Sequence, residues 1–154
     1  WINSDGKHNM PSGEVFSAPV ENSVEGKIRC TFPGIYMGKE IEDITLEFRR
    51  GKVVKAKAAK GQELLDNLLK VDEGASRLGE VAIGTNDGIR KFTKNILFDE
   101  KLGGTIHMAI GNAYLECRAK NKSAIHWDII KDMKKGGEIY GDGILIYKNG
   151  KWLK

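Results

Sequence analysis

Glycine is the residue that most constrains the fold of this chain. The 154 residues include 19 glycines and only 3 prolines, and glycine is the residue that tight turns most readily accept. Frequent turns leave room only for short elements between them. In several of these elements apolar residues alternate with polar ones, which is the pattern of half-buried strands. We therefore expect many short strands.

Two hairpins are predicted from turn residues flanked by apolar runs. In residues 40–59, apolar and polar residues alternate on the way to Arg50-Gly51, and an apolar pair follows that turn. Residues 143–153 predict a second hairpin, because Asn149-Gly150 is a strongly favoured two-residue turn. Two further strands are expected at residues 26–32 and 77–83.

Two segments have the spacing of a helix. Residues 61–70 place leucines at the positions that share one helical face, and residues 87–98 predict a surface helix on the same grounds. Strands and helices do not alternate regularly along the chain, which argues against a parallel doubly wound sheet. The expected fold class is α+β: strand-rich, with a mostly antiparallel or barrel-like sheet and a few helices.

Composition is ordinary for a globular domain of this length, with 40% hydrophobic and 30% charged residues. No apolar run is long enough to cross a membrane, so no membrane role is expected. The formal net charge is +4, but lysines are interleaved with acids, and the basic strip that would favour nucleic-acid binding is absent. Cys30 and Cys117 lie far apart, which is typical of a reduced cytoplasmic chain, although one disulfide stays possible.

The sequence opens with Trp1 rather than Met. We therefore expect the natural start to lie upstream or to have been removed, and residues 1–154 to form a single domain of a longer protein. His8 lies in the polar opening segment, where no specific role is expected.

The run Ile125-His126-Trp127-Asp128 places two metal-binding side chains two residues apart in an apolar, strand-like stretch. Strand side chains alternate between faces, so His126 and Asp128 should point the same way. An imidazole beside a carboxylate can bind a divalent cation. A buried histidine hydrogen-bonded to a nearby aspartate would leave the same pattern.

Two glutamates interrupt apolar strand patterns. Glu14 enters the strand-like run 15–18 with Phe16 as its neighbour on the same face, and Glu80 lies in the apolar segment 78–84. A buried carboxylate is costly unless it is paired or bound to a metal. Exposure at a sheet edge or a salt bridge would explain each glutamate taken singly.

His107 lies in another apolar stretch, seven residues before Tyr114. If this stretch is helical, the two side chains share a face; if it is extended, the odd separation places them on opposite faces. Gly111 weakens the helical reading. An ordinary core histidine and an ordinary buried aromatic residue are the alternatives.

Glu100 lies among charged residues, and on its own is best explained as a solvated turn acid. The polar residues embedded in apolar strings form a mixed set of carboxylates and imidazoles, suited to zinc, cobalt or manganese. The set exceeds the three protein ligands of one catalytic zinc, and a bridged pair of metal ions would use all of its members. These residues are Glu14, Glu80, His107, His126 and Asp128.

Four motifs, in the same order along the chain, together resemble the thermophilic-type aminopeptidases of peptidase family M29. The motifs are Asn9-Met10-Pro11-Ser12-Gly13-Glu14-Val15-Phe16, Gly79-Glu80-Val81-Ala82, Phe98-Asp99-Glu100 with His107-Met108-Ala109-Ile110-Gly111, and Ile125-His126-Trp127-Asp128. The loop between Glu100 and His107 is longer than in some relatives.

The resemblance implies a metal-dependent aminopeptidase domain, a C-terminal fragment of a longer two-domain protein. It implies two divalent metal ions, peptide substrates with a free N-terminus, and a homodimer. The implied metal-binding residues are Glu14, Glu80, Glu100, His107, His126 and Asp128. Glu80 is also the expected general base, and Tyr114 the expected donor to the oxyanion. The alternatives are an inactive metal-binding or structural fragment and another two-metal hydrolase.

Overall fold

The computed structural model describes residues 1–7 and 9–153, and short strands dominate it. The strands are β1 (Ile2–Asn3), β2 (Glu14–Ser17), β3 (Gly26–Arg29), β4 (Gly34–Tyr36), β5 (Lys39–Ile41), β6 (Thr45–Arg49), β7 (Lys52–Lys57), β8 (Leu78–Gly84), β9 (Thr105–Gly111), β10 (His126–Asp132), β11 (Glu138–Gly141), β12 (Ile144–Lys148) and β13 (Lys151–Trp152). The helices are α1 (Gln62–Leu68) and α2 (Ile96–Asp99), with 3-10 turns at Gly74–Ser76 and Leu115–Cys117.

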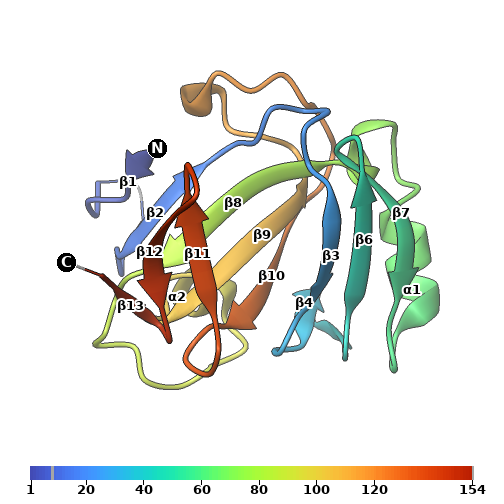
Figure 1. Cartoon of the computed structure of the whole chain (residues 1–154). Helices are drawn as coiled ribbons and strands as arrows, with labels where there is room; N and C mark the ends of the chain where they lie inside the picture. Colours follow the sequence, from blue (N-terminus) through green and yellow to red (C-terminus); the bar gives the residue numbers. More distant parts are fainter. Residues whose placement is uncertain (8, 154) are drawn as a thin grey trace.

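A five-stranded sheet crosses the middle of the molecule in the order β1-β2-β8-β9-β10 (Figure 1). All neighbouring strands in it are antiparallel. β9 and β10 pair without interruption from His126 opposite Gly111 to Asp132 opposite Thr105. Such regular pairing holds neighbouring side chains on each face at fixed positions.

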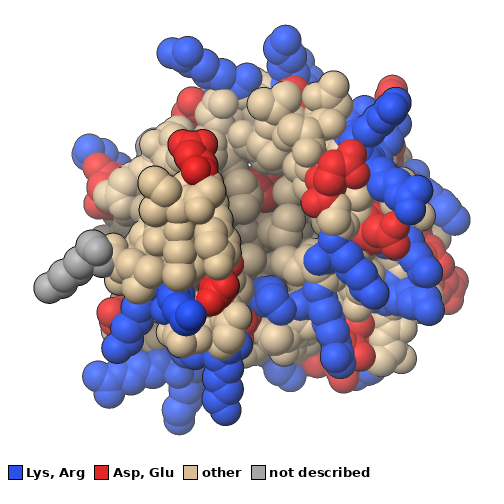
Figure 2. Space-filling view, viewed as in Figure 1, with Lys and Arg blue, Asp and Glu red and all other residues tan. Residues whose placement is uncertain are grey.

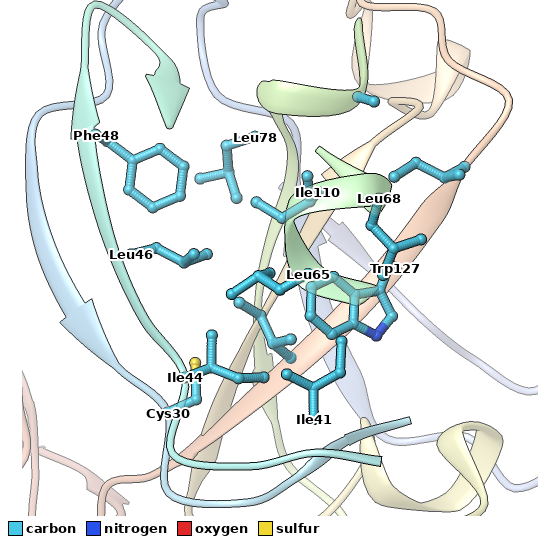
Figure 3. Packing of buried hydrophobic residues seen from close by; sticks show 13 residues of the cluster. Cys30, Ile41, Ile44, Leu46, Phe48, Leu65, Leu68, Leu78, Ile110 and Trp127 are labelled. Carbon is cyan, nitrogen blue, oxygen red and sulfur yellow. The ribbon is translucent and has the colours of Figure 1, made fainter. Parts of the chain in front are cut away.

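The main core lies between this sheet, the three-stranded sheet β3-β6-β7 and helix α1. Figure 3 shows Trp127 and Ile110 of the five-stranded sheet together with Leu46 of β6 and Leu65 of α1. Trp127 is 2% exposed, and its indole Nε1 donates a hydrogen bond to the Ile35 carbonyl oxygen at 3.1 Å. One face of the sheet is therefore committed to apolar packing, and the other face is left for the polar residues.

The C-terminal strands form a separate small antiparallel sheet, β11-β12-β13, near β8 and β9 (Figure 1). A second apolar cluster, built around Ile83, Met133 and Tyr147, joins it to the main sheet. On the face that Figure 2 shows, Lys and Arg side chains are spread around the outline with acids among them.

Both predicted hairpins are confirmed. Arg50-Gly51 joins β6 to β7, with φ of 47° and 74°, and Asn149-Gly150 joins β12 to β13, with φ of 50° and 80°. Two successive positive φ values match the twist of a two-residue hairpin, and Asn and Gly tolerate them best. The strands predicted at residues 26–32 and 77–83 are also present, as β3 and β8. β3 ends at Arg29, before the predicted residue 32.

The predicted helix at 61–70 is confirmed as α1, but the one at 87–98 is wrong: only Ile96–Asp99 is helical. Polar side chains stop the helix from extending backwards. Asn95 caps α2 by accepting a hydrogen bond from the Leu97 backbone. The buried Asp99 carboxylate accepts hydrogen bonds from the backbone N–H of Thr93 at 2.6 Å and from its hydroxyl at 2.8 Å, which holds the preceding segment in a non-helical turn.

Of the two predicted sheet arrangements, mostly antiparallel and barrel-like, the antiparallel one is correct. Among the described residues the sheets do not close into a barrel, since β1 and β10 are the free edges of the five-stranded order. Cys30 and Cys117 are both free thiols, and burial raises the pKa of Cys30 to about 12. None of the helices in the described ranges has the length and apolar character needed to cross a bilayer.

Candidate metal centre

Polar side chains from four strands converge on the face of the five-stranded sheet that lies opposite the core. We call these residues the cluster: Glu14 on β2, Glu80 on β8, His107 on β9, and His126 and Asp128 on β10. All except His126 are at most 8% exposed. Strands that pair in register bring these distant parts of the sequence together.

A β-bulge turns Glu80 toward the cluster. Leu78 pairs with Ile110 and Glu80 pairs with Ala109, so Gly79 is an extra residue on β8. In a regular strand Leu78 and Glu80 would share one face; the bulge instead leaves Leu78 in the core and sends Glu80 to the opposite face. A Cβ at position 79 would lie 2.4 Å from a backbone carbonyl oxygen of β9, so this close approach requires glycine.

Two alanines leave space between the larger side chains of the cluster. Ala82 pairs with His107, and Ala109 pairs with both Glu80 and Asp128. Both alanines are fully buried. Since paired residues share a face, these small side chains form the floor beneath the acids and the imidazole.

The cluster residues contact one another through nitrogen–oxygen pairs. His107 Nε2 lies 3.2 Å from Glu14 Oε2 and 3.6 Å from Glu80 Oε1. His126 Nε2 lies 3.1 Å from Glu80 Oε2 and 3.7 Å from Asp128 Oδ1. Glu80 is therefore the carboxylate that joins the two imidazoles.

A backbone contact orients His126. Its Nδ1 lies 2.7 Å from the Asn112 carbonyl oxygen, which can only accept, so Nδ1 carries the proton in this hydrogen bond. The Nε2 lone pair of the neutral ring is then directed into the cluster. Metal-binding histidines are commonly fixed in this way by a carbonyl group behind the ring.

Glu100 joins the cluster from the end of α2, together with a lysine that sequence reasoning missed. The Lys101 side chain is fully buried, and its Nζ lies 2.8 Å from Glu14 Oε1 and also contacts the carboxylate of Glu100. Glu14 therefore does have the salt bridge that was one alternative for it. In the sequence, Lys101 ends a charged string typical of an exposed turn, so nothing there indicated its burial.

Tyr114 borders the cluster, although β9 is extended. The strand ends at Gly111, whose φ is 104°, and the bend brings the Tyr114 ring centroid to 5.0 Å from that of His126. Neither a continuous helix nor a continuous strand describes this segment. Burial and the charges of Glu80 and Asp128 raise the pKa of Tyr114, so its hydroxyl keeps the proton it can donate.

The imidazoles and Glu80 shift one another's pKa in opposite directions. Burial opposes ionisation of Glu80, but hydrogen bonds from His107 and His126 outweigh it and lower its pKa to about 2. Burial also opposes protonation of the histidines, but their carboxylate partners raise the pKa of His107 to about 10 and that of His126 to about 9.

The acids at the edge of the cluster differ in the direction of their pKa shifts. The pKa of Glu14 is lowered, because His107 and Lys101 outweigh its burial. Burial and the nearby Asp128 charge raise the pKa of Glu100, and burial raises that of Asp128. Protons on the imidazoles and on these acids thus compensate the carboxylate charge, a task that a bound cation would take over.

The donor atoms fit a divalent metal ion. Three overlapping groups each offer one imidazole nitrogen and two carboxylate oxygens within 4.8 Å of one another: Glu14, Glu80 and His107; Glu80, His126 and Asp128; and Glu100, His107 and Asp128. Asp128 Oδ1 and His107 Nδ1 are buried without a hydrogen-bond partner, and an unsatisfied buried acceptor such as this carboxylate oxygen is suited to a metal ion. Three ligands of this type leave an open position on zinc.

All six residues expected to bind metal therefore lie together in the described part of the chain, with Tyr114 beside them. His8 lies outside the described residues. Besides Lys101, sequence reasoning also missed the Asn112 carbonyl, because a backbone contact depends on how β10 is paired rather than on residue type.

We expect metal affinity to rise with pH. Metal binding needs neutral imidazoles, whereas His107 and His126 hold protons up to a pKa of about 10 and about 9. Each proton displaced should strengthen binding about tenfold per pH unit below these values. Isothermal titration of Mn²⁺ or Zn²⁺ between about pH 6.5 and 8.5, in buffers of different ionisation heat, measures affinity and proton release together. A pH-independent affinity would contradict this expectation.

Comparison with known proteins matches the whole chain to one family. The sequence model of the thermophilic metalloproteases (M29) matches residues 1–152. Aminopeptidase AmpS of Bacillus subtilis is 37% identical over 167 residues, which cover 94% of this chain and 40% of that protein. Aminopeptidase T of Thermus thermophilus is 35% identical, with the same coverage of both proteins. The chain thus spans about 40% of the length of these curated relatives.

Solved structures agree on the fold. Wild-type AmpT from Thermus thermophilus matches with a TM-score of 0.83 and 35% identity, over 95% of this chain and 41% of that one. A dihydroxypyridine dioxygenase from Pseudomonas putida matches with a TM-score of 0.73 but only 21% identity, over 93% of this chain and 44% of that one. The second match shows a shared fold alone.

Proposed function

The chain belongs to the thermophilic metalloprotease (M29) family, and we propose that it forms the metal-binding catalytic domain, residues 1–154, of an aminopeptidase. Such an enzyme hydrolyses the first peptide bond of a peptide with a free N-terminus. The observation that carries this proposal is the convergence of imidazole and carboxylate donors on one sheet face. Relatives named aminopeptidases support the choice of substrate.

We propose two divalent ions, of zinc, cobalt or manganese, as the cofactors. The residues that would hold them are Glu14, Glu80, Glu100, His107, His126 and Asp128. Mixed nitrogen and oxygen donors suit these metals, and the three overlapping ligand groups are more than one ion needs. When bound, such ions supply Lewis-acid polarisation of the scissile carbonyl and lower the pKa of a water molecule toward neutrality.

Glu80 is the residue best placed to move protons. Its carboxylate lies between His107 and His126, at 3.6 and 3.1 Å from their Nε2 atoms. It is ionised at neutral pH, which is the state that a general base needs. In the proposed reaction Glu80 accepts the proton of the attacking water and returns it to the leaving amine.

Tyr114 would stabilise the oxyanion. It retains its proton, because burial and the cluster's negative charge raise its pKa, and its ring lies against that of His126. A hydroxyl at the border of the cluster can donate a hydrogen bond to the negative oxygen that forms during attack.

The substrate's amino group would be bound by a metal ion or by a carboxylate of the cluster. The cluster with Glu100 contains four carboxylates, against which Lys101 supplies one permanent positive charge, so two divalent ions would offset the remaining negative charge. A free amine has a lone pair that a metal ion can accept and N–H groups that a carboxylate can accept from, whereas the lone pair of an acetylated nitrogen is delocalised into the amide. This difference accounts for a preference for chain ends.

A homodimer, implied by the family resemblance, and a cytoplasmic location, which two free cysteines favour, are further parts of the proposal. Light scattering of the natural-length protein measures the oligomeric state. Another two-metal hydrolase is the competing function, and turnover of p-nitrophenyl phosphate in place of peptides would favour it.

Metal removal tests the proposed function. We expect chelation with EDTA to lower the cleavage of leucyl peptides by at least about 100-fold, as when a principal catalytic group is lost. Adding Mn²⁺, Co²⁺ or Zn²⁺ back should restore it, and N-acetylated versions of the same peptides should resist cleavage. Chelator-insensitive activity, or equal cleavage of acetylated peptides, would refute a metal-dependent aminopeptidase.

A further inference from the structure

A small cavity opens beside the cluster, lined in part by residues of β1 and β2. It has a volume of about 270 Å³, and Ile2, Phe16 and Tyr114 share its lining with polar residues. Glu14 lines this cavity and is also a member of the cluster. The cavity therefore adjoins the proposed reaction site at Glu14.

The apolar wall of the cavity is built by strand pairing. Phe16 follows Glu14 by two residues on β2, so both side chains lie on the cluster face. Ile2 of β1 pairs directly with Phe16 and extends the same face outward. The Tyr114 ring completes the wall, with its centroid 5.4 Å from that of Phe16 in an edge-to-face arrangement at 63°.

The β1 segment that forms the outer side is held in place. The Ser4 backbone N–H donates to the Glu14 carbonyl oxygen at 3.0 Å, which continues the β1–β2 pairing beyond Asn3. The Ser12 hydroxyl donates to the Ser4 carbonyl oxygen from the other side. These bonds tie the outer side of the cavity to β2, and such preorganisation favours binding.

We propose that this cavity receives the side chain of the substrate's N-terminal residue and selects apolar side chains of leucine to phenylalanine size. The inference rests on the proposed aminopeptidase function. An enzyme of that kind holds the free amine and the first carbonyl group, and the first side chain leaves the same Cα as the amine. That side chain must enter a cavity adjoining the residues that hold these groups, as this one does at Glu14.

The volume of the cavity and the charges of its lining residues define which N-terminal side chains it selects. A volume of 270 Å³ lies below the roughly 300–1,000 Å³ of cavities that enclose drug-sized ligands, so it suits a single side chain rather than a continuing peptide. Ile2, Phe16 and the Tyr114 ring offer apolar contact. Asp5, Glu14 and Glu116 line the same cavity and repel an acidic side chain, so aspartyl and glutamyl termini are poor substrates.

Cavity-filling variants test the inference in the natural-length, metal-loaded enzyme. Ile2→Trp and Phe16→Trp each add bulk to the apolar wall, while Ile144→Trp adds the same bulk at a strand position that is 68% exposed. The measured quantity is the ratio of kcat/KM for phenylalanyl p-nitroanilide to that for alanyl p-nitroanilide. We expect this ratio to fall at least about tenfold in the first two variants, in the range that pocket fit controls, and to stay constant in Ile144→Trp.

Two results would overturn the inference while leaving the aminopeptidase function intact. One is an unchanged ratio in both cavity variants that retain activity. The other is a change confined to the second residue in a series of leucyl dipeptides, which would assign the cavity to the leaving side of the substrate. Wild-type enzyme that cleaves no aminoacyl p-nitroanilide would instead refute the proposed function, and this inference with it.

Discussion

Glu80→Gln should lower peptide turnover by at least about 100-fold, the effect typical of losing a general base. The substitution keeps the shape of the side chain but removes the charge that joins His107 to His126. An amide cannot accept the proton of the attacking water, and it is a weaker metal ligand than a carboxylate. The measurement is kcat/KM for leucyl p-nitroanilide at saturating Mn²⁺, with metal content determined on the same sample.

Metal content separates the two roles of Glu80. Lost turnover with retained metal indicates a base, and loss of both indicates an essential ligand. Glu63→Gln is the matched control, because Glu63 is exposed on α1, and it should leave kcat/KM unchanged. If Glu80→Gln turned over substrate like the wild type, Glu80 would have no part in the mechanism.

Lys101→Met should destabilise the metal-free protein by about 3–5 kcal/mol, the usual cost of removing one partner of a buried ion pair. Methionine has a similar length and no charge, so Glu14 and Glu100 lose the ammonium group that both contact in a fully buried position. Urea unfolding followed by circular dichroism measures the change in the free energy of unfolding.

Two conditions should reduce the loss of stability in Lys101→Met. Mn²⁺ supplies positive charge to the same carboxylates, so it should stabilise the variant more than the wild type. Loss of Lys101 raises the folded-state pKa of both carboxylates, so the variant's deficit should shrink as the pH falls and the acids become protonated. Lys70→Met, at an exposed position, should change stability by no more than about 0.5 kcal/mol. An equally small effect at Lys101 would show that the buried ion pairs contribute nothing.

Local sequence patterns predicted the elements whose formation depends on local chemistry. Asn149-Gly150 forms a hairpin turn because both residues tolerate the positive φ values that it needs, and Gly51 supplies one such residue after Arg50. The leucines of 61–70 form α1 because their spacing alone creates an apolar face. The helix predicted at 87–98 does not form, because Asp99 accepts hydrogen bonds from Thr93. The spacing of apolar residues does not reveal this interaction.

In the candidate site, too, local patterns predicted some positions and contacts between strands decided others. His126 and Asp128 share a face because two residues separate them in a strand, which sequence alone indicates. Glu80 faces them only because the bulge at Gly79 reverses the expected alternation after Leu78. A bulge depends on the neighbouring strand, so it cannot be derived from β8 by itself.

By itself the sequence determined the strand-rich class, the two hairpins, helix α1 and the residue types able to bind a metal ion. Only the tertiary structure decided that Lys101 is buried between two acids, that Tyr114 reaches His126 after a bend, and that Phe16 and Ile2 wall a cavity beside Glu14. The physical reason is the distance along the sequence over which each kind of interaction acts. Turn preferences and helical spacing act within a few residues, whereas burial, ion pairing and cavity shape arise from strands that pair across the whole chain.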